Sequence, residues 1–305
     1  MELSLFDLHC DTATALLRDG ASLYDNNCHV SLKKAADFSG YRQIMAIWSD
    51  KELDDEQAFE RFVRVADYIR TQLKTNSFPL LENAASLPSR GAFLAVEDAR
   101  ILGGNIQRLN ILYEYGVRFL TPVWGGESCI GGAHDTSVGL TPFGKQTVNA
   151  CFSLGIVPDV SHASQKTAWE IFELATQNGR PVIASHSNAY SITPHTRNLT
   201  DDQFMTIQKL GGIVGICLCP AHLNTNPDAA DIDSILKHIE HFYSLGGEDC
   251  LCLGCDLDGT SLPIGFSSLK DVSCIADLMA QHGYSDRQIE KLFYKNAENF
   301  VTKNL

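Results

Sequence analysis

The chain has 305 residues, of which 44% are hydrophobic and 20% charged, so it is long enough to bury a sizeable core. Its net charge of -13 argues against binding to nucleic acid or to an anionic membrane, because both need a basic face. The acidic balance does not exclude an anionic substrate, which a local arginine or metal ion can bind.

The ends and the cysteines of the chain indicate its compartment. The first ten residues, MELSLFDLHC, contain no basic segment and no long apolar run, which predicts no secretory signal. No apolar run in the sequence is long enough to span a bilayer. The ten cysteines are scattered, and several fall in expected strands, which is typical of buried thiols in a reducing compartment. We therefore expect a cytoplasmic protein without membrane or nucleic-acid partners.

Eight short apolar runs alternate with amphipathic stretches along the chain. Such runs are typical of parallel strands that are covered on both faces. The expected strands are residues 3–8, 43–48, 92–96, 118–123, 156–161, 181–185, 212–218 and 251–255.

Helices are expected between these strands. Apolar residues at helical spacing predict a helix across 59–73. Thr141 followed by Pro142 predicts the start of another helix, and Gly155 its end. Capping-box spacing at 200–203 and 285–288 and amphipathic patterns at 164–177, 233–245 and 269–282 indicate the remaining helices.

This alternation predicts an α/β fold, a (β/α)8 TIM-type barrel that spans residues 1–305 as one metal-dependent hydrolase domain. The alternative is an open, doubly wound sheet. No GxGxxG loop follows any of the expected strands, which favours the barrel.

Metal-capable side chains follow five of the expected strands. In a parallel barrel, side chains at the C-terminal ends of strands meet at one end of the barrel. Reading those ends in chain order gives His9, Asp11, Glu97, His162, His186, Asp256 and Asp258.

Taken singly, each of these residues could satisfy a backbone group, pair with an arginine or stabilise a turn. Gly259 is expected to adopt a strained conformation in the turn that contains Asp256. Burying several carboxylates together is costly, however, and divalent cations remove that cost. Imidazoles favour zinc-like metals, and five ligands suit two metals that share one carboxylate. The remaining Asp256 is then placed to transfer protons, which predicts hydrolysis.

At these residues the sequence resembles the membrane (renal) dipeptidase family, zinc dipeptidases of the amidohydrolase superfamily. The resemblance runs from DLHCDT at residue 7 to KNAENF near the C-terminus. It includes the segments AVED, GVRFLTPVW, GLTPFGKQTVNACFSLGIVPDVSHAS, PVIASHSNAY, TRNLTDD and LGCDLDG.

The resemblance implies a role for each site residue. It implies that His9 and Asp11 bind one Zn²⁺, that His162 and His186 bind a second, and that Glu97 bridges the two. It further implies that Asp256 is the catalytic acid and base, with Asp258 a less favoured candidate.

The resemblance also implies how the substrate is held. It implies that Arg197 grips the C-terminal carboxylate of a dipeptide, for which a planar guanidinium is well suited. A homodimer is expected from the family alone.

One position departs from the family pattern. Well-known members carry a histidine just after the fourth strand, which helps to polarise the scissile carbonyl, whereas this chain has Trp124 there. Trp124 is therefore expected to form a wall of the substrate pocket. His134 lies ten residues further on, and the sequence leaves its reach open.

The expected activity is hydrolysis of free dipeptides, including those with a C-terminal D-residue. One alternative is a related amidohydrolase that acts on a lactone, a cyclic amide or an N-acyl amino acid. Another is a non-catalytic binding protein that keeps the fold.

Overall fold

Seven parallel strands form one curved sheet in the computed structural model, which describes residues 2–50, 52–85 and 87–305. The strands follow the order β5-β4-β3-β2-β1-β7-β6 across the sheet. Their bounds are β1 Leu5–Cys10, β2 Tyr41–Trp48, β3 Arg90–Glu97, β4 Val117–Thr121, β5 Val157–Pro158, β6 Val214–Ile216 and β7 Leu251–Leu253. Each of these seven strands overlaps a strand that was expected from the sequence.

The remaining expected strand, 181–185, closes the sheet through isolated bridges rather than a full ladder. Ile183 bridges Asp159 beside β5, and Ala184 bridges Val214 in β6, both in the parallel sense. The backbone N–H of Gly215 donates to the carbonyl of Ala184 at 2.8 Å. The segment therefore occupies the sixth position of the barrel, and the fold is the expected TIM-type barrel.

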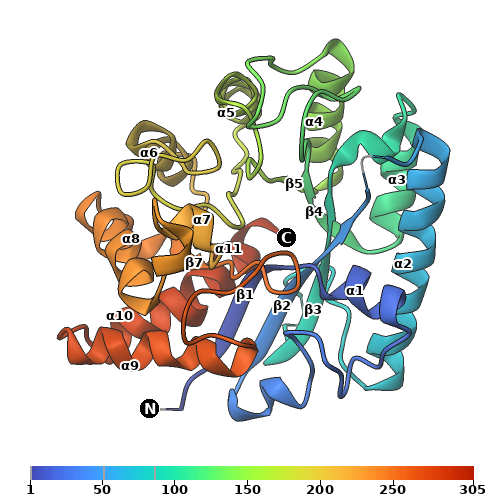
Figure 1. Ribbon diagram of the computed structural model, residues 1–305. Coiled ribbons are helices and arrows are strands. Elements are labelled where there is room, and N and C mark those ends of the chain that lie inside the picture. The colour runs from blue at the N-terminus through green and yellow to red at the C-terminus, as the bar shows by residue number, and fades with distance from the viewer. Residues whose placement is uncertain (1, 51, 86) are drawn as a thin grey trace.

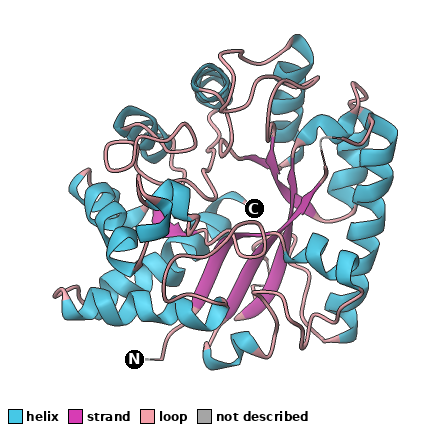
Figure 2. Ribbon diagram, in the orientation of Figure 1, coloured by secondary structure: helices cyan, strands magenta, loops and turns pink. Residues whose placement is uncertain are grey.

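The helices surround the strands, as Figure 1 and Figure 2 show. The first, α1 and α2, follow β1 and β2 and lie together on one side of the molecule (Figure 1). The helix bounds are α1 Thr12–Asp19, α2 Asp55–Thr75, α3 Gln107–Glu114, α4 Pro142–Leu154, α5 Gln165–Asn178, α6 Asp201–Lys209, α7 Pro220–Leu223, α8 Ile232–Ser244, α9 Ser273–Gln281, α10 Asp286–Glu290 and α11 Asn296–Asn304. Among the described residues, no helix has the length and apolar character to cross a bilayer.

The helix ends expected from the sequence are confirmed. Thr141 caps α4 by accepting from the N–H of Gly144, and Gly155 ends that helix in the left-handed conformation. Complete capping boxes start α6 at Thr200 and α10 at Ser285.

The inside of the barrel is polar beneath its C-terminal end. Because side chains alternate along a strand, Asp7 shares the inward face of β1 with His9. The buried Asp7 carboxylate accepts from Gln43 Nε2 at 2.9 Å and from the Cys255 N–H at 2.7 Å. Burial, opposed by these bonds, raises the pKa of Asp7. The network ties β1, β2 and the residues after β7 together directly below the candidate site.

Two glycines allow the closing segment to approach its neighbours. A Cβ on Gly254 would lie 1.7 Å from the carbonyl oxygen of Ser185, and a Cβ on Gly215 would lie 2.0 Å from it. A backbone carbonyl cannot move aside as the end of a flexible side chain can. Segment 181–185 can therefore occupy the sixth position only because both neighbouring residues are glycine.

We predict that Gly254→Ala lowers the free energy of unfolding by about 1–3 kcal/mol, because the Ser185 backbone must move. Urea unfolding measures this change. Gly125→Ala is the matched control, since nothing lies within 4 Å of its added Cβ. Equal stability of the two variants would contradict this account of barrel closure.

Candidate metal centre

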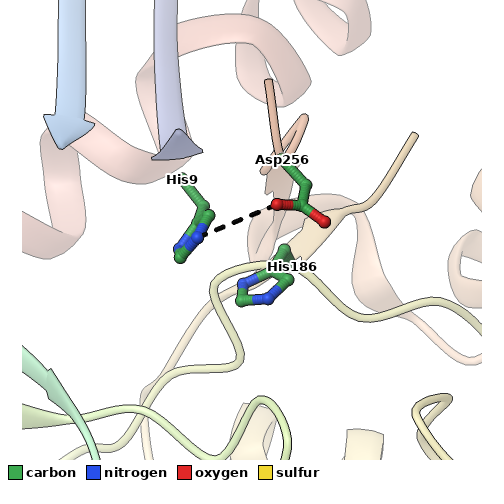
Figure 3. A group of neighbouring side chains, drawn as sticks. All are labelled: His9, His186 and Asp256. Carbon is green, nitrogen blue, oxygen red and sulfur yellow. Dashed lines mark ion pairs between the residues drawn. The ribbon is translucent and has the colours of Figure 1, made fainter. Parts of the chain in front are cut away.

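The expected site residues converge at the C-terminal end of the barrel. Figure 3 shows three of them, His9, His186 and Asp256, pointing toward one another from separate segments. His9 belongs to β1, and Glu97 is the last residue of β3. The other residues of the group lie in the loops that follow their strands.

Three of these loop residues have a strained backbone. His162 and Asp256 have φ values of 69° and 58°, and Asp258, the third such residue of the group, has a φ of 68°; residues other than glycine rarely adopt this left-handed region. Strained backbone conformations of this kind are concentrated at functional sites. There the surrounding structure stabilises them, and they direct a side chain toward the site.

One group of ligand atoms is formed by Glu97, His162 and His186. The Nε2 atoms of the two histidines lie 3.0 Å apart. Glu97 Oε1 lies 2.9 Å from His162 Nε2 and 3.5 Å from His186 Nε2. All three side chains are largely buried.

The hydrogen bonds behind these imidazoles fix their tautomers. His162 Nδ1 lies 3.0 Å from the carbonyl oxygen of Trp124, which can only accept, so Nδ1 carries the proton. Ser185 Oγ donates to the Asp159 carboxylate and therefore accepts from His186 Nδ1 at 2.7 Å. Both Nε2 atoms then present lone pairs to each other and to a carboxylate. A cation among them turns this repulsion into coordination.

A second group is formed by His9, Asp11 and Glu97. His9 Nε2 lies 3.4 Å from Asp11 Oδ2 and 3.6 Å from Glu97 Oε2. This nitrogen is buried and has no hydrogen-bond partner among the described residues. Glu97 thus contributes one oxygen to each group, as expected of a bridging ligand, and the residues present fit a pair of metal ions.

The third acid, Asp256, stands beside this second group. Its Oδ1 lies 3.9 Å from His9 Nε2, and it also forms a possible ligand set with His9 and His186. The Sγ of Cys217 donates to Oδ2 at 3.8 Å. Asp256 therefore faces the same space as the two candidate metal positions.

Crowding perturbs the acids strongly. Burial, with the added repulsion of Glu97, raises the pKa of Asp11 to about 6. Burial raises the pKa of Asp256 to about 8, and the charges of Asp11 and Glu97 act in the same direction. Both shifts have the same cause, acids that are buried close together, and such an arrangement is typical of sites that bind cations.

Asp258 has a different role from Asp256. Its carboxylate accepts from Thr12 Oγ1 at 2.6 Å and from the His29 N–H at 2.5 Å, so its oxygens are engaged in holding the loop around His29. Gly259 was expected to adopt a strained backbone conformation, and this expectation is wrong. Asp256 and Asp258 take positive φ, whereas Gly259 is needed because a Cβ there would lie 2.1 Å from Asp11 Oδ2.

A cavity of about 610 Å³ opens above these groups. Arg197 and Trp124, both expected to bind substrate, line it. Arg197 is buried and its Nη2 has no hydrogen-bond partner among the described residues. The Trp124 ring packs edge-on against Trp48 with centroids 5.2 Å apart, so the two tryptophans form an apolar wall.

Three histidines that sequence reasoning left open or missed line the same cavity: His134, His195 and His222. His134 does reach the site, because it lines this cavity and its ring centroid lies 6.0 Å from that of His162. Burial, followed by the charge of Arg197, lowers the pKa of His134 to about 4, so its imidazole is neutral. The sequence contains one indication that His195 belongs to the site, because it lies two residues before Arg197 in the segment PHTRNL.

Comparison with solved structures identifies close counterparts of this fold. A metallo peptidase from Rhodobacter sphaeroides, liganded with a phosphinate mimic of the dipeptide L-Ala-D-Ala, is 25% identical with a TM-score of 0.92, covering all of both chains. The dipeptidase AC, a metallo peptidase of family M19, is 26% identical with a TM-score of 0.92, covering 100% of this chain and 99% of its own.

Sequence comparison agrees with these structures. A Klebsiella pneumoniae protein, described as an uncharacterized protein in the pqqA 5' region, is 31% identical over 212 residues, which are 66% of this chain and 77% of that protein. The family model for membrane dipeptidase, peptidase family M19, matches residues 1–303. The chain therefore belongs to the membrane dipeptidase family.

Proposed function

We propose that this protein is a binuclear zinc dipeptidase that hydrolyses free dipeptides, including those with a C-terminal D-residue. The observation that carries the proposal is the meeting of two unprotonated imidazole nitrogens and a shared carboxylate, which calls for cations between them. The dipeptide mimic bound to the Rhodobacter sphaeroides metallo peptidase supports the substrate class.

The chain offers a complete ligand set for two metals. His9 and Asp11 would hold one ion, His162 and His186 the other, and Glu97 both. When bound, such a pair supplies Lewis acidity to a carbonyl and lowers the pKa of water enough to make a nucleophile at neutral pH.

Asp256 transfers the proton in this proposal. Its carboxylate faces both ligand groups, is buried, and has no arginine or lysine within ion-pairing distance among the described residues. It can therefore take a proton from the attacking water and deliver it to the nitrogen of the departing amine.

Arg197 and the tryptophans hold the substrate. The unpaired Arg197 guanidinium suits the C-terminal carboxylate of a free dipeptide, which it can bind by two parallel hydrogen bonds. Trp124 excludes water from the reacting bond as part of the apolar wall.

A related amidohydrolase activity on a lactone, a cyclic amide or an N-acyl amino acid is the second candidate. Trp124, in place of the family's carbonyl-polarising histidine, favours it. A substrate panel that contains dipeptides and these compounds separates the two, and preference for uncharged substrates would favour the second.

We predict that the purified protein, loaded with zinc, holds two metal ions per chain by elemental analysis. His162→Ala should hold about one, because the ligands of the other ion remain, and His282→Ala, a change at an exposed histidine, should hold two. Chelation should lower the melting temperature of the wild-type protein. One metal or none in the wild type would contradict the binuclear proposal.

We predict that Asp256→Asn keeps both metals but loses about 10²–10⁴-fold in kcat, since an amide cannot accept the proton. Steady-state kinetics with Ala-D-Ala, alongside metal analysis of the same sample, measures both properties. Wild-type turnover in this variant would remove Asp256 from the mechanism.

We predict that Arg197→Met lowers kcat/KM for free dipeptides by about 10- to 100-fold, the usual cost of losing a charge-assisted hydrogen bond. Dipeptide amides, which lack the carboxylate, should be affected much less. Arg180→Met, at an exposed position, is the control. An equal loss on free and amidated dipeptides would show that Arg197 does not bind the carboxylate.

A further inference from the structure

Two arginines that are not fully exposed carry a guanidinium without a hydrogen-bond or ion-pair partner in the described part of the chain: Arg197 is buried, and Arg61 is half-buried with a buried Nε. The other arginines that are not fully exposed hold a carboxylate or backbone carbonyls: Arg42, Arg90, Arg100, Arg108 and Arg118. Arg61 and Arg197 have no side-chain hydrogen bond or ion pair among the described residues. Both line the 610 Å³ cavity above the candidate metal centre.

Arg61 faces the cavity from the side opposite Arg197. It belongs to α2, which follows β2, whereas Arg197 follows the sixth barrel position, 181–185. The second and sixth positions of an eight-position barrel face each other across its axis. Thus the two unpaired charges stand on opposite walls, with the ligand groups between them.

Trp48 links the Arg61 wall to the metal ligands. It is the last residue of β2 and pairs in register with Glu97 on β3. Its indole Nε1 is buried and has no hydrogen-bond partner among the described residues, as is also true of Arg61 Nε. Buried donors without partners are rare in folded proteins, and two of them on one wall of a cavity indicate a missing acceptor.

Among the residues that the structure describes, the neighbouring charged groups on this wall, Arg18 and Asp50, do not pair with Arg61. Arg18 is exposed and pairs with Asp19 at 2.7 Å. Asp50 Oδ1 accepts the N–H of Glu52, and no ion pair within 4.0 Å joins Asp50 to Arg61 in the described chain. The positive charge of Arg61 is therefore available to a ligand.

We propose that Arg61 and Trp48 form a subsite for the side chain of the substrate's N-terminal residue, and that this subsite selects an acidic residue. The inference rests on the proposed dipeptidase function. With the C-terminal carboxylate at Arg197 and the scissile carbonyl at the ligand groups, the N-terminal residue extends toward the α2 wall. The Trp48 face covers its methylene groups, and the Arg61 guanidinium binds its carboxylate.

Glu-Ala and Gln-Ala test this subsite, because their N-terminal side chains have the same shape and differ in charge. The zinc-loaded wild-type enzyme should favour Glu-Ala at least about tenfold in kcat/KM. Arg61→Gln should abolish the preference by lowering kcat/KM for Glu-Ala about 10- to 100-fold while leaving Gln-Ala within about twofold. Arg61→Glu should favour Lys-Ala over Glu-Ala.

Controls separate recognition from folding. Arg64→Gln changes an exposed arginine of the same helix and should keep the wild-type preference. Arg61→Lys retains the charge and should keep part of the preference for Glu-Ala, with a melting temperature close to that of wild type.

The outcomes distinguish this inference from the function on which it rests. Equal use of Glu-Ala and Gln-Ala by the wild type, or a uniform loss on both in Arg61→Gln, overturns the acidic subsite and leaves the dipeptidase function standing. Hydrolysis of no dipeptide in the panel by the metal-loaded enzyme overturns both.

Discussion

The structure depends on one electrostatic constraint, the burial of several acids and imidazoles in a space that lacks enough positive charge of its own. Glu97 lies 2.9 Å from His162 Nε2 and 3.6 Å from His9 Nε2, and among the described residues no lysine or arginine forms an ion pair with it. Isolated charges in such surroundings cost far more free energy than a single hydrogen bond returns. The divalent cations that we propose at this place would reconcile the crowding with a stable fold, and they would bring the reactivity that a peptidase needs.

The barrel meets this constraint through backbone features as much as through ligands. Asp256 takes a strained φ of 58°, and Gly259 has no side chain that would collide with the nearby carboxylates. Ser185 and Asp159 orient His186 from behind, and the Trp124 carbonyl orients His162. Groups that hold ligands in place in this way usually matter almost as much as the ligands themselves.

The barrel, and the meeting of the candidate ligand residues at one end of it, could be predicted from the sequence because strands and strand ends follow simple rules. Apolar runs mark strands, and residues such as Glu97 at their C-terminal ends must share one end of a parallel barrel. The cavity walls follow no such rule. Arg61 lies within the amphipathic pattern of α2, and His222 in the four-residue helix α7, so only the fold brings them near the site. Backbone conformations at His162 and Gly259 likewise depend on tertiary contacts that a pattern does not encode.

The charges around the cavity are arranged differently from what the net negative charge of the chain suggests. Its centre is negative, whereas its opposite walls carry Arg61 and Arg197, which is the charge distribution that a dipeptide with two carboxylates would complement. Everything in this account depends on cations at the centre. Anomalous scattering from crystals of the zinc-loaded protein tests this most directly. The account predicts two zinc peaks per chain, on either side of Glu97, and a single peak elsewhere, or none, would contradict it.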